Sequence, residues 1–327
     1  MLTLDELEAA EKVVRAALPP TPAIHWPLIS GRLGATAIVK HENHNPTGAF
    51  KVRGGLTFVD ALKKRRPGVK GLISATRGNH GQSLAFAARR AGLSVDIYVP
   101  RNNSVEKNAA MRALGARLVE HGDDFQEARE EAMRIAESVG LEPVPSFHLD
   151  LVRGVSTYAL ELFRQHGDLD VLYVPVGLGS GIVGCIFARQ ALGLKTEIVG
   201  VQAKGAPAYA LSFAAGRPVA TNAADTLADG VATRVPDADA LAVILKGVER
   251  VALVSDDEIA EAIRIYWRDA HNLAEGAGAA PLAAALQERE RLRGKKVGLV
   301  LSGGNIDFEL FQRWVAAPGA STPKNPK

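Results

Sequence analysis

The chain has 327 residues, 47% of them apolar and 23% charged, so it is long enough for two domains or one large domain with an ample core. Its 39 basic and 36 acidic residues nearly balance, which argues against a protein that binds nucleic acid or a membrane surface. The single cysteine, Cys185, excludes an internal disulfide and fits a reducing compartment.

The first twenty residues predict a helix rather than a targeting segment. Thr3 is the expected N-cap, Glu6 would complete a capping box, and Pro19 stands near the expected end of the helix. The segment lacks the basic start and apolar centre of a signal peptide. No apolar run in the chain reaches the length of a membrane span. We therefore expect a cytoplasmic protein.

Lys51 lies in an unusual setting, the segment HNPTGAFKVRGG at residues 44–55. A lysine on a solvated helix face needs no small, turn-forming and apolar neighbours, whereas small residues allow close approach of a second molecule to the backbone. We interpret Lys51 as a residue that contacts a bound molecule. The pair His41 and His44 has a spacing seen in metal sites, but it flanks an expected strand end and does not favour zinc.

Strands and helices are expected to alternate along most of the chain. Short apolar runs predict strands at 69–74, 94–100, 116–120, 169–176, 196–202 and 295–302. Amphipathic patterns between them, such as 104–115 and 124–140, predict helices. This alternation predicts an α/β fold with mostly parallel sheet flanked by helices. The Pro-, Ser- and Lys-rich residues from about 316 to 327 predict a disordered tail.

Three of the expected strands end in glycine-rich turns that each open a helix. These turns are TRGNHGQS at 76–83, GLGSGIVG at 177–184 and SGGN at 302–305. In sheets of this kind, ligands bind beyond the carboxyl ends of the strands. We therefore expect one site built from these three turns together with the segment around Lys51.

The loop GLGSGIVG offers backbone N–H groups and the positive end of a helix dipole, which together suit a phosphate. It also contains the dinucleotide pattern at Gly179, Gly181 and Gly184, but that interpretation needs an acidic residue where Gln202 ends the next strand. An NAD-binding oxidoreductase is therefore a remote alternative. A lysine near a phosphate loop instead suggests covalent attachment of pyridoxal phosphate.

Five segments now suggest a family. ENHNPTGAFKVRGG, GNHGQS, PVGLGSGIVG, DGVATR and LSGGNID occur in the order and rough spacing of the fold-type II pyridoxal-phosphate enzymes. Over about residues 15–315 the chain most resembles the threonine/serine dehydratase and serine racemase branch. The resemblance implies a fold like that of the tryptophan synthase β chain, with pyridoxal 5'-phosphate between a large domain (1–47 and 148–327) and a small domain (48–147). It also implies a homodimer.

The resemblance assigns roles to individual residues. Lys51 would bind the cofactor aldehyde and serve as the base, Phe50 would pack near the ring, and Ser302 would face the ring nitrogen. Asn79 would bond the cofactor's 3-hydroxyl. The cofactor phosphate would be held by the backbone of Gly177, Leu178, Gly179, Ser180 and Gly181. The substrate carboxylate would be held by the N–H groups of Thr76, Gly78, Asn79 and His80. Whether Glu275 touches the cofactor stays open.

Two departures from the family pattern are informative. Arg77 stands where racemases of this branch have a serine that acts on the second face of the α-carbon, and arginine is a poor proton donor or acceptor. Arg77 either contacts the substrate or points to solvent. Gln202 and Ala208 stand where many relatives have two acidic metal ligands, so we expect no divalent cation there.

The sequence therefore predicts an enzyme that binds a small amino acid. We expect a pyridoxal-phosphate dependent dehydratase, or ammonia-lyase, that converts a 3-hydroxy-L-amino acid into a 2-oxo acid and ammonia by α,β-elimination. Threonine, serine, 3-phenylserine and 3-hydroxyaspartate all remain open as substrates. A racemase and a β-replacement synthase of the same fold are the alternatives.

Overall fold

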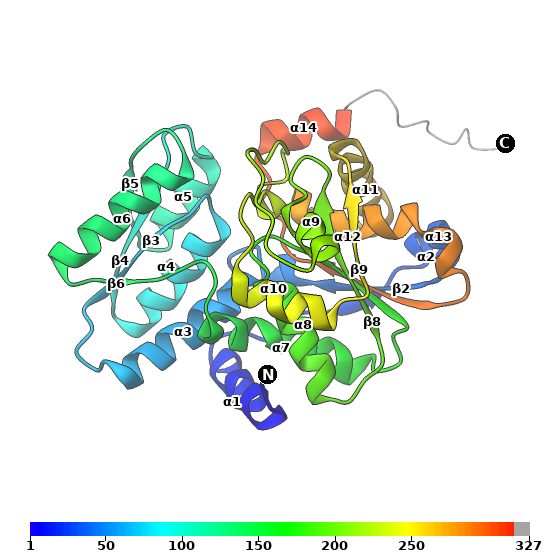
Figure 1. The fold of residues 1–327 in the computed structure, drawn as a ribbon, viewed down its shortest axis with the longest axis horizontal. Coiled ribbons are helices and arrows are strands. Elements are labelled where there is room, and N and C mark those ends of the chain that lie inside the picture. Colours follow the sequence, from blue (N-terminus) through cyan, green and yellow to red (C-terminus); the bar gives the residue numbers. More distant parts are fainter. Residues whose placement is uncertain (317–327) are drawn as a thin grey trace.

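The computed structural model describes residues 1–316. The tail expected to be disordered from about 316 to 327 lies outside this range except for Ala316, which ends a helix. Its strands form two separate sheets, each flanked by helices, and Figure 1 shows the two corresponding lobes. The α/β fold expected from the sequence is confirmed. The domain boundaries near residues 47 and 147 stay a prediction, although every strand from 71 to 143 belongs to one sheet and every other strand to the second.

The larger sheet has six strands in the order β1-β2-β10-β7-β8-β9, and only β1 is antiparallel to its neighbour. In chain order these strands are β1 (Ala23–His25), β2 (Thr36–His41), β7 (Val171–Pro175), β8 (Glu197–Ala203), β9 (Arg250–Val254) and β10 (Lys296–Leu301). One face packs on α2 (Pro27–Leu33), α11 (Asp256–Ala270), α12 (Gly276–Gln287), α13 (Arg289–Leu292) and α14 (Phe308–Ala316). The other packs on α1 (Leu4–Arg15), α7 (Leu149–Gln165), α8 (Ser180–Ala191), α9 (Ala208–Ala215) and α10 (Ala238–Gly247).

The smaller sheet has four parallel strands in the order β5-β4-β3-β6. Its strands are β3 (Gly71–Ala75), β4 (Ser94–Val99), β5 (Arg117–Glu120) and β6 (Glu142–Pro143). One apolar core lies under α3 (Lys51–Arg65), α4 (Asn79–Ala91) and α5 (Val105–Ala113), and a second lies under α6 (Phe125–Val139). Two short 3-10 helices, η1 (Glu42–His44) and η2 (Asp229–Val231), complete the described elements.

Local sequence signals explain several of these elements. The Thr3–Glu6 capping box is formed at the start of α1, as expected from the sequence, and Asp124 caps α6 by accepting from the N–H of Glu127. The sequence did not predict β1, β2, β6 or β9. Three of these, β1, β6 and β9, lie at sheet edges and consist mainly of partly exposed residues, so their apolar patterns are weak. β2 is buried, but its apolar run covers only residues 37–39.

A buried ion cluster fixes the start of α3 to the larger lobe. The guanidinium of Arg53 is fully buried and donates to Glu42, at the end of β2, over 2.7 Å. It also donates to Glu161 on α7, and the Lys40 ammonium shares that carboxylate. Because removing one partner of such a cluster leaves an uncompensated buried charge, the first turn of α3 is held in a fixed place.

No helix within residues 1–316 is both long enough and apolar enough to cross a membrane.

Candidate active site

The four segments singled out in the sequence meet at the ends of the strands. The N–H of Phe50 donates to the carbonyl of Ser302 over 3.0 Å, and Ala49 pairs with Gly303 in an isolated bridge. The Lys51 Nζ atom lies 3.5 Å from the Ser180 Oγ atom, at the start of α8. The structure therefore brings Lys51, the SGGN segment and the GLGSG loop together.

Lys51 is the first residue of α3, and its side chain points into this meeting place. Burial, partly offset by the charge of Glu275, lowers the pKa of the Lys51 amine to about 8. The Lys51 carbonyl accepts from Ser83 over 2.6 Å, which ties the turn to α4. An amine with this pKa loses its proton easily near neutral pH, so Lys51 is suited to nucleophilic and base chemistry.

The loop between β7 and α8 is built to hold an anion. Gly179 adopts a φ of 97°, in the left-handed region, and no side chain of the described residues caps α8, so its first N–H groups face the site. The Tyr209 hydroxyl donates to the Leu178 carbonyl over 3.0 Å, and the Tyr158 hydroxyl donates to the Gly181 carbonyl over 3.0 Å. These two buried tyrosines fix the loop from behind.

The turn after β3 offers fewer free N–H groups than the sequence suggested. The N–H of Thr76 donates to Tyr98, and the N–H of Gly78 donates to the Thr76 hydroxyl over 3.1 Å. The N–H groups of Asn79 and His80, in the first turn of α4, have no partner among the described residues. A carboxylate held here would therefore use the N-terminus of α4.

The side chains of His80 and Arg77, which flank this turn, differ in burial and charge. Burial and the nearby charge of Lys51 lower the pKa of His80 to about 3, so its imidazole is neutral. The Arg77 side chain is exposed and makes no hydrogen bond or ion pair with the described residues, while its carbonyl accepts from Asn103 over 3.3 Å. Of the two alternatives for Arg77, the structure shows the one in which the side chain points to solvent.

Asn79 lies in a hydrogen-bonded chain that joins the two lobes. Its amide nitrogen donates to Glu275 over 2.8 Å, and its oxygen accepts from Asn305 over 2.7 Å. Burial raises the pKa of the Glu275 carboxyl. A side-chain amide has two N–H donors and two lone pairs, so Asn79 can still bond a ligand. Glu275 thus lies beside the site, within the electrostatic reach of Lys51.

Gln202 and Ala208 stand where relatives have acidic metal ligands, and the side chain of Gln202 forms internal hydrogen bonds instead. Gln202 is fully buried, and its side-chain oxygen accepts from the N–H of Ala210 over 3.0 Å. Ala208, the first residue of α9, carries no ligand atom on its side chain. Within residues 1–316 no group of three His, Cys, Asp or Glu side chains is placed to hold a metal ion.

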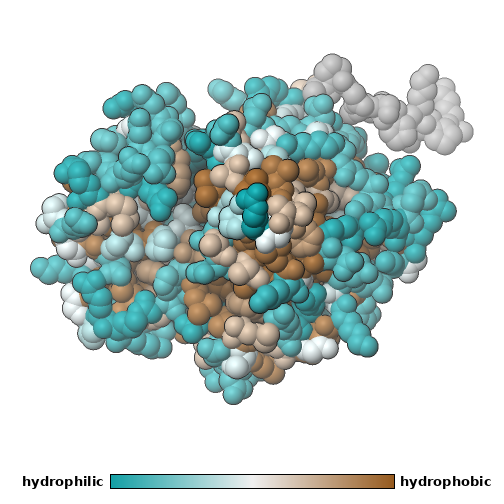
Figure 2. All heavy atoms as spheres, in the orientation of Figure 1, coloured by the Kyte–Doolittle hydropathy of each residue, from teal (hydrophilic) through white to brown (hydrophobic). Residues whose placement is uncertain are grey.

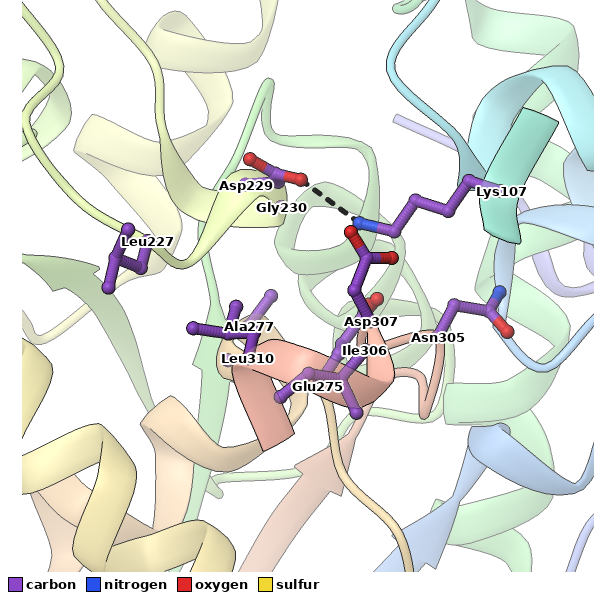
Figure 3. Close-up of a pocket in the computed structure, with 11 residues that line it drawn as sticks. Lys107, Leu227, Asp229, Gly230, Glu275, Ala277, Asn305, Ile306, Asp307 and Leu310 are labelled. Carbon is purple, nitrogen blue, oxygen red and sulfur yellow. Dashed lines mark hydrogen bonds and ion pairs between the residues drawn. The ribbon is translucent and has the colours of Figure 1, made fainter. Parts of the chain in front are cut away.

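Several residues at the site were not identified from the sequence. Lys107 on α5 lies against Gly78 and forms an ion pair with Asp229 over 3.0 Å (Figure 3). Asn305 and Tyr209 support Asn79 and the anion loop. Asn305 and Asp229 belong to the segments LSGGNID and DGVATR, which gave a signal, whereas Lys107 resembles any lysine of an amphipathic helix.

The arrangement fits a cofactor that carries both a phosphate and an aldehyde. The uncapped start of α8 suits the phosphate, and the Lys51 amine lies 3.5 Å from the Ser180 hydroxyl at that helix start, so one small molecule can reach both. Ser302 is buried directly after β10, and its hydroxyl can form a hydrogen bond with a ring nitrogen. Two small residues, Ala49 and Gly303, pair beside Lys51 and Ser302.

Comparison with known proteins gives the same result. The family model described as "Pyridoxal-phosphate dependent enzyme" matches residues 14–303. The chain is 33% identical to an L-threonine ammonia-lyase of Thermotoga maritima, over 96% of this chain and 78% of that one. It is 32% identical to an L-threo-3-hydroxyaspartate ammonia-lyase of a Pseudomonas species, over 94% and 96%. Among solved structures, maize serine racemase superposes with a TM-score of 0.90 at 26% identity, over 95% and 96%.

Proposed function

The chain belongs to the family of pyridoxal-phosphate dependent enzymes, and we propose that it is a dehydratase that releases ammonia and a 2-oxo acid from a 3-hydroxy-L-amino acid. One observation carries the proposal: the buried amine of Lys51 lies 3.5 Å from Ser180, at an uncapped helix start, and next to the segment that holds Ser302. Relatives named for threonine and 3-hydroxyaspartate ammonia-lyase activity support it.

We assign the cofactor contacts as the sequence predicted them. Lys51 binds the aldehyde, Phe50 packs on the ring, Asn79 bonds the 3-hydroxyl and Ser302 faces the ring nitrogen. The phosphate is held by backbone N–H groups of the segment Gly177, Leu178, Gly179, Ser180 and Gly181. The position of Phe50 supports this assignment, because its ring lies 3.6 Å from where a Cβ atom on Gly181 would stand.

We assign the substrate carboxylate to the turn at residues 76–80, chiefly to the N–H groups of Asn79 and His80 at the start of α4. In this role Thr76 is a positioning residue, because its hydroxyl holds Gly78 in the turn. The neutral imidazole of His80 places no competing charge beside Lys51. Arg77 contributes its backbone, since its side chain faces solvent.

The reaction then depends on one base. Pyridoxal phosphate, when bound, supplies an electron sink that makes the α-proton of a bound amino acid acidic. Lys51, whose pKa is lowered to about 8, takes that proton. The N-terminus of α4 orients the carboxylate so that the α-carbon faces Lys51. The Tyr158 and Tyr209 hydroxyls keep the phosphate loop rigid while the β-hydroxyl leaves.

Elimination is favoured over racemisation for a geometric reason. A racemase needs a second proton donor on the far face of the α-carbon, and the residue before Gly78 is the exposed, permanently charged Arg77. The likeness to maize serine racemase keeps racemisation as the second candidate. A β-replacement synthase would release the same products in the absence of an added nucleophile. Only an assay with an added nucleophile therefore distinguishes it from a dehydratase.

We also propose that the protein is a cytoplasmic homodimer active in amino-acid catabolism. Figure 2 shows an apolar area on the face formed by α8, α9 and α10 and the loops near them. Leu211 on α9 and Val235 shortly before α10 are 43% and 61% exposed, and a contiguous exposed apolar area is typical of a contact between protein chains. Light scattering of the purified protein tests the dimer, and replacement of both residues by serine should weaken it.

A panel of 3-hydroxy amino acids, assayed for ammonia and 2-oxo acid, tests the activity. We expect both products in equal amounts from at least one member, and no product from the Lys51→Ala variant. A thiol added to the assay should leave the yield of 2-oxo acid unchanged. A new sulfur-containing amino acid would instead identify a β-replacement synthase.

A further inference from the structure

A small cavity of about 30 Å³ lies between the lobes, next to the turn at residues 76–80 (Figure 3). Lys107 of α5 lines one side of it. The larger lobe contributes three carboxylates, those of Asp229, Glu275 and Asp307. The remaining wall is mainly apolar and includes Ile306 and Leu310. The cavity therefore combines one cation, three acidic groups and apolar surface.

Lys107 is packed tightly into this position. Its Cδ atom lies 2.6 Å from where a Cβ atom on Gly78 would stand, so its alkyl chain covers the turn that opens α4. Its side chain is only 11% exposed, and its ammonium is 3.0 Å from an oxygen of Asp229. Burial alone would lower the pKa of Lys107, but the charges of Asp229 and Glu275 raise it instead.

The ion pair also joins the two lobes. Lys107 lies on α5 of the smaller lobe, and Asp229 belongs to η2 of the larger one. Nearby, the Ser104 hydroxyl donates to Asp307 over 2.5 Å, and the N–H of Phe308 donates to Glu106 over 2.9 Å. These contacts hold the carboxylate turn and the cavity in a closed arrangement, so the cavity is the space beside an amino acid bound on the turn.

The charges in the cavity disfavour a second carboxylate on the substrate. The ammonium of Lys107 is already paired with Asp229, and Asp307 and Glu275 stand close by (Figure 3). A further negative group would stand among three carboxylates and one cation that is already paired, an arrangement that repels it although Asp229 itself is 44% exposed. A methyl group or hydrogen atom would instead contact the apolar wall at Ile306 and Leu310.

We propose that Lys107 and Asp229 determine substrate specificity by closing the site around 3-hydroxy amino acids with a small, uncharged β-substituent and excluding those with a second carboxylate. This inference rests on the proposed dehydratase activity. It selects threonine and serine, and it excludes 3-hydroxyaspartate even though one of the relatives is named for that compound. Arg77 does not reverse the selection, because its side chain points to solvent and is not among the residues that line the cavity.

Turnover of two substrates by the holoenzyme tests the proposal. The wild type should have a kcat/KM for L-threonine at least roughly tenfold above that for L-threo-3-hydroxyaspartate. Asp229→Asn frees the Lys107 ammonium as a counter-ion and should shift this ratio toward 3-hydroxyaspartate by roughly tenfold or more. Lys107→Met removes the cation and should shift it the other way. If Lys107 and Asp229 had only a structural role, the ratio of the two kcat/KM values would shift in the same direction in both variants.

The matched control is Asp225→Asn, which removes an exposed carboxylate from the loop before η2, where it bonds no described side chain. That variant should keep the wild-type ratio. Equal or better turnover of 3-hydroxyaspartate by the wild type would overturn the proposal, as would an unchanged ratio in Asp229→Asn. If Arg77→Ala alone shifts the ratio, Arg77 determines specificity and the proposal is wrong.

Binding provides a readout that does not depend on turnover. L-Aspartate and L-asparagine have nearly the same shape, differ in one charge and lack the leaving hydroxyl. Their affinities can be measured from the change in visible absorption of the cofactor-loaded protein. The wild type should bind L-asparagine more tightly, and Asp229→Asn should narrow the difference; tighter binding of L-aspartate by the wild type contradicts the proposal. Absence of ammonia from every amino acid would refute the dehydratase activity, while this binding preference could still be measured.

Discussion

Replacement of Tyr209 by phenylalanine should weaken both the fold and the binding of pyridoxal phosphate. The Tyr209 side chain is fully buried, and its hydroxyl donates to Leu178 over 3.0 Å while it accepts from the N–H of Asp237 over 3.1 Å. Each buried hydrogen bond contributes about 1 kcal/mol net, and an N–H left without a partner costs somewhat more, so we expect a loss of about 2–3 kcal/mol in the free energy of unfolding.

The same change should affect the cofactor because Leu178 lies in the phosphate loop. Without the hydroxyl, the Leu178 carbonyl is no longer fixed, and the loop must be ordered when phosphate binds. If half of the lost energy appears in binding, the dissociation constant for pyridoxal phosphate should rise by about tenfold. Fluorescence titration of the apoprotein measures this constant, and urea unfolding of the apoprotein measures stability separately.

Tyr266 provides the matched control. It is also fully buried, but its hydroxyl has no hydrogen-bond partner among the described residues. Tyr266→Phe therefore removes the same atom without breaking a bond, and it should leave stability unchanged or slightly raised. It should not change cofactor affinity. Equal effects of the two substitutions on the dissociation constant would show that the hydroxyl of Tyr209 does not support the loop.

Three further predictions concern Lys51, metal ions and acid stability. Borohydride reduction of the holoprotein should attach the cofactor permanently to the peptide that contains Lys51, as mass spectrometry can show. The rate at which the apoprotein binds the cofactor covalently should rise with increasing pH, with a midpoint at about pH 8. A midpoint near pH 10.5 would show that burial does not lower the pKa of this amine. Exhaustive chelation should leave activity and Tm unchanged, because Gln202 and Ala208 offer no carboxylate; restoration of lost activity by Mg²⁺ would disprove this. The folded protein holds His80 neutral down to about pH 3, whereas the unfolded chain takes up a proton near pH 6.5. The free energy of unfolding should therefore decrease as the pH is lowered from 6.5 to 3, by at most roughly 1.4 kcal/mol per pH unit. His80→Gln should remove this part of the loss in urea titrations at several pH values, and an unchanged pH dependence would contradict the prediction.

The sequence predicted which segments meet at the candidate site, because glycine-rich backbone patterns mark these segments. Glycine-rich turns after apolar strands indicate where strand ends face a ligand, and the parallel sheet brings such ends together. Lys51, Ser180 and Ser302 were therefore identified although they are far apart in the chain. The structure places all three together.

The remaining features depend on contacts that no local pattern reveals. Lys107 lies on a helix whose spacing suits a solvated lysine, and only its packing against Gly78 shows why its side chain is just 11% exposed. Asn305 reaches Asn79 across 226 positions of sequence. The free N–H groups of the turn at 76–80 were also overestimated, because the Thr76 hydroxyl takes up the N–H of Gly78. Such bonds are determined by tertiary structure.

The central claim is that Lys51 drives elimination from a 3-hydroxy amino acid. A proton NMR time course in deuterated water, with L-threonine and the purified holoprotein, tests it most directly. We predict that the loss of threonine in these spectra equals the appearance of 2-oxobutanoate, that an enzymatic assay of the same samples finds an equal amount of ammonia, that no D-amino acid forms, and that Lys51→Ala yields neither product. Accumulation of a D-amino acid, or product formation by the Lys51→Ala variant at the wild-type rate, would contradict the claim.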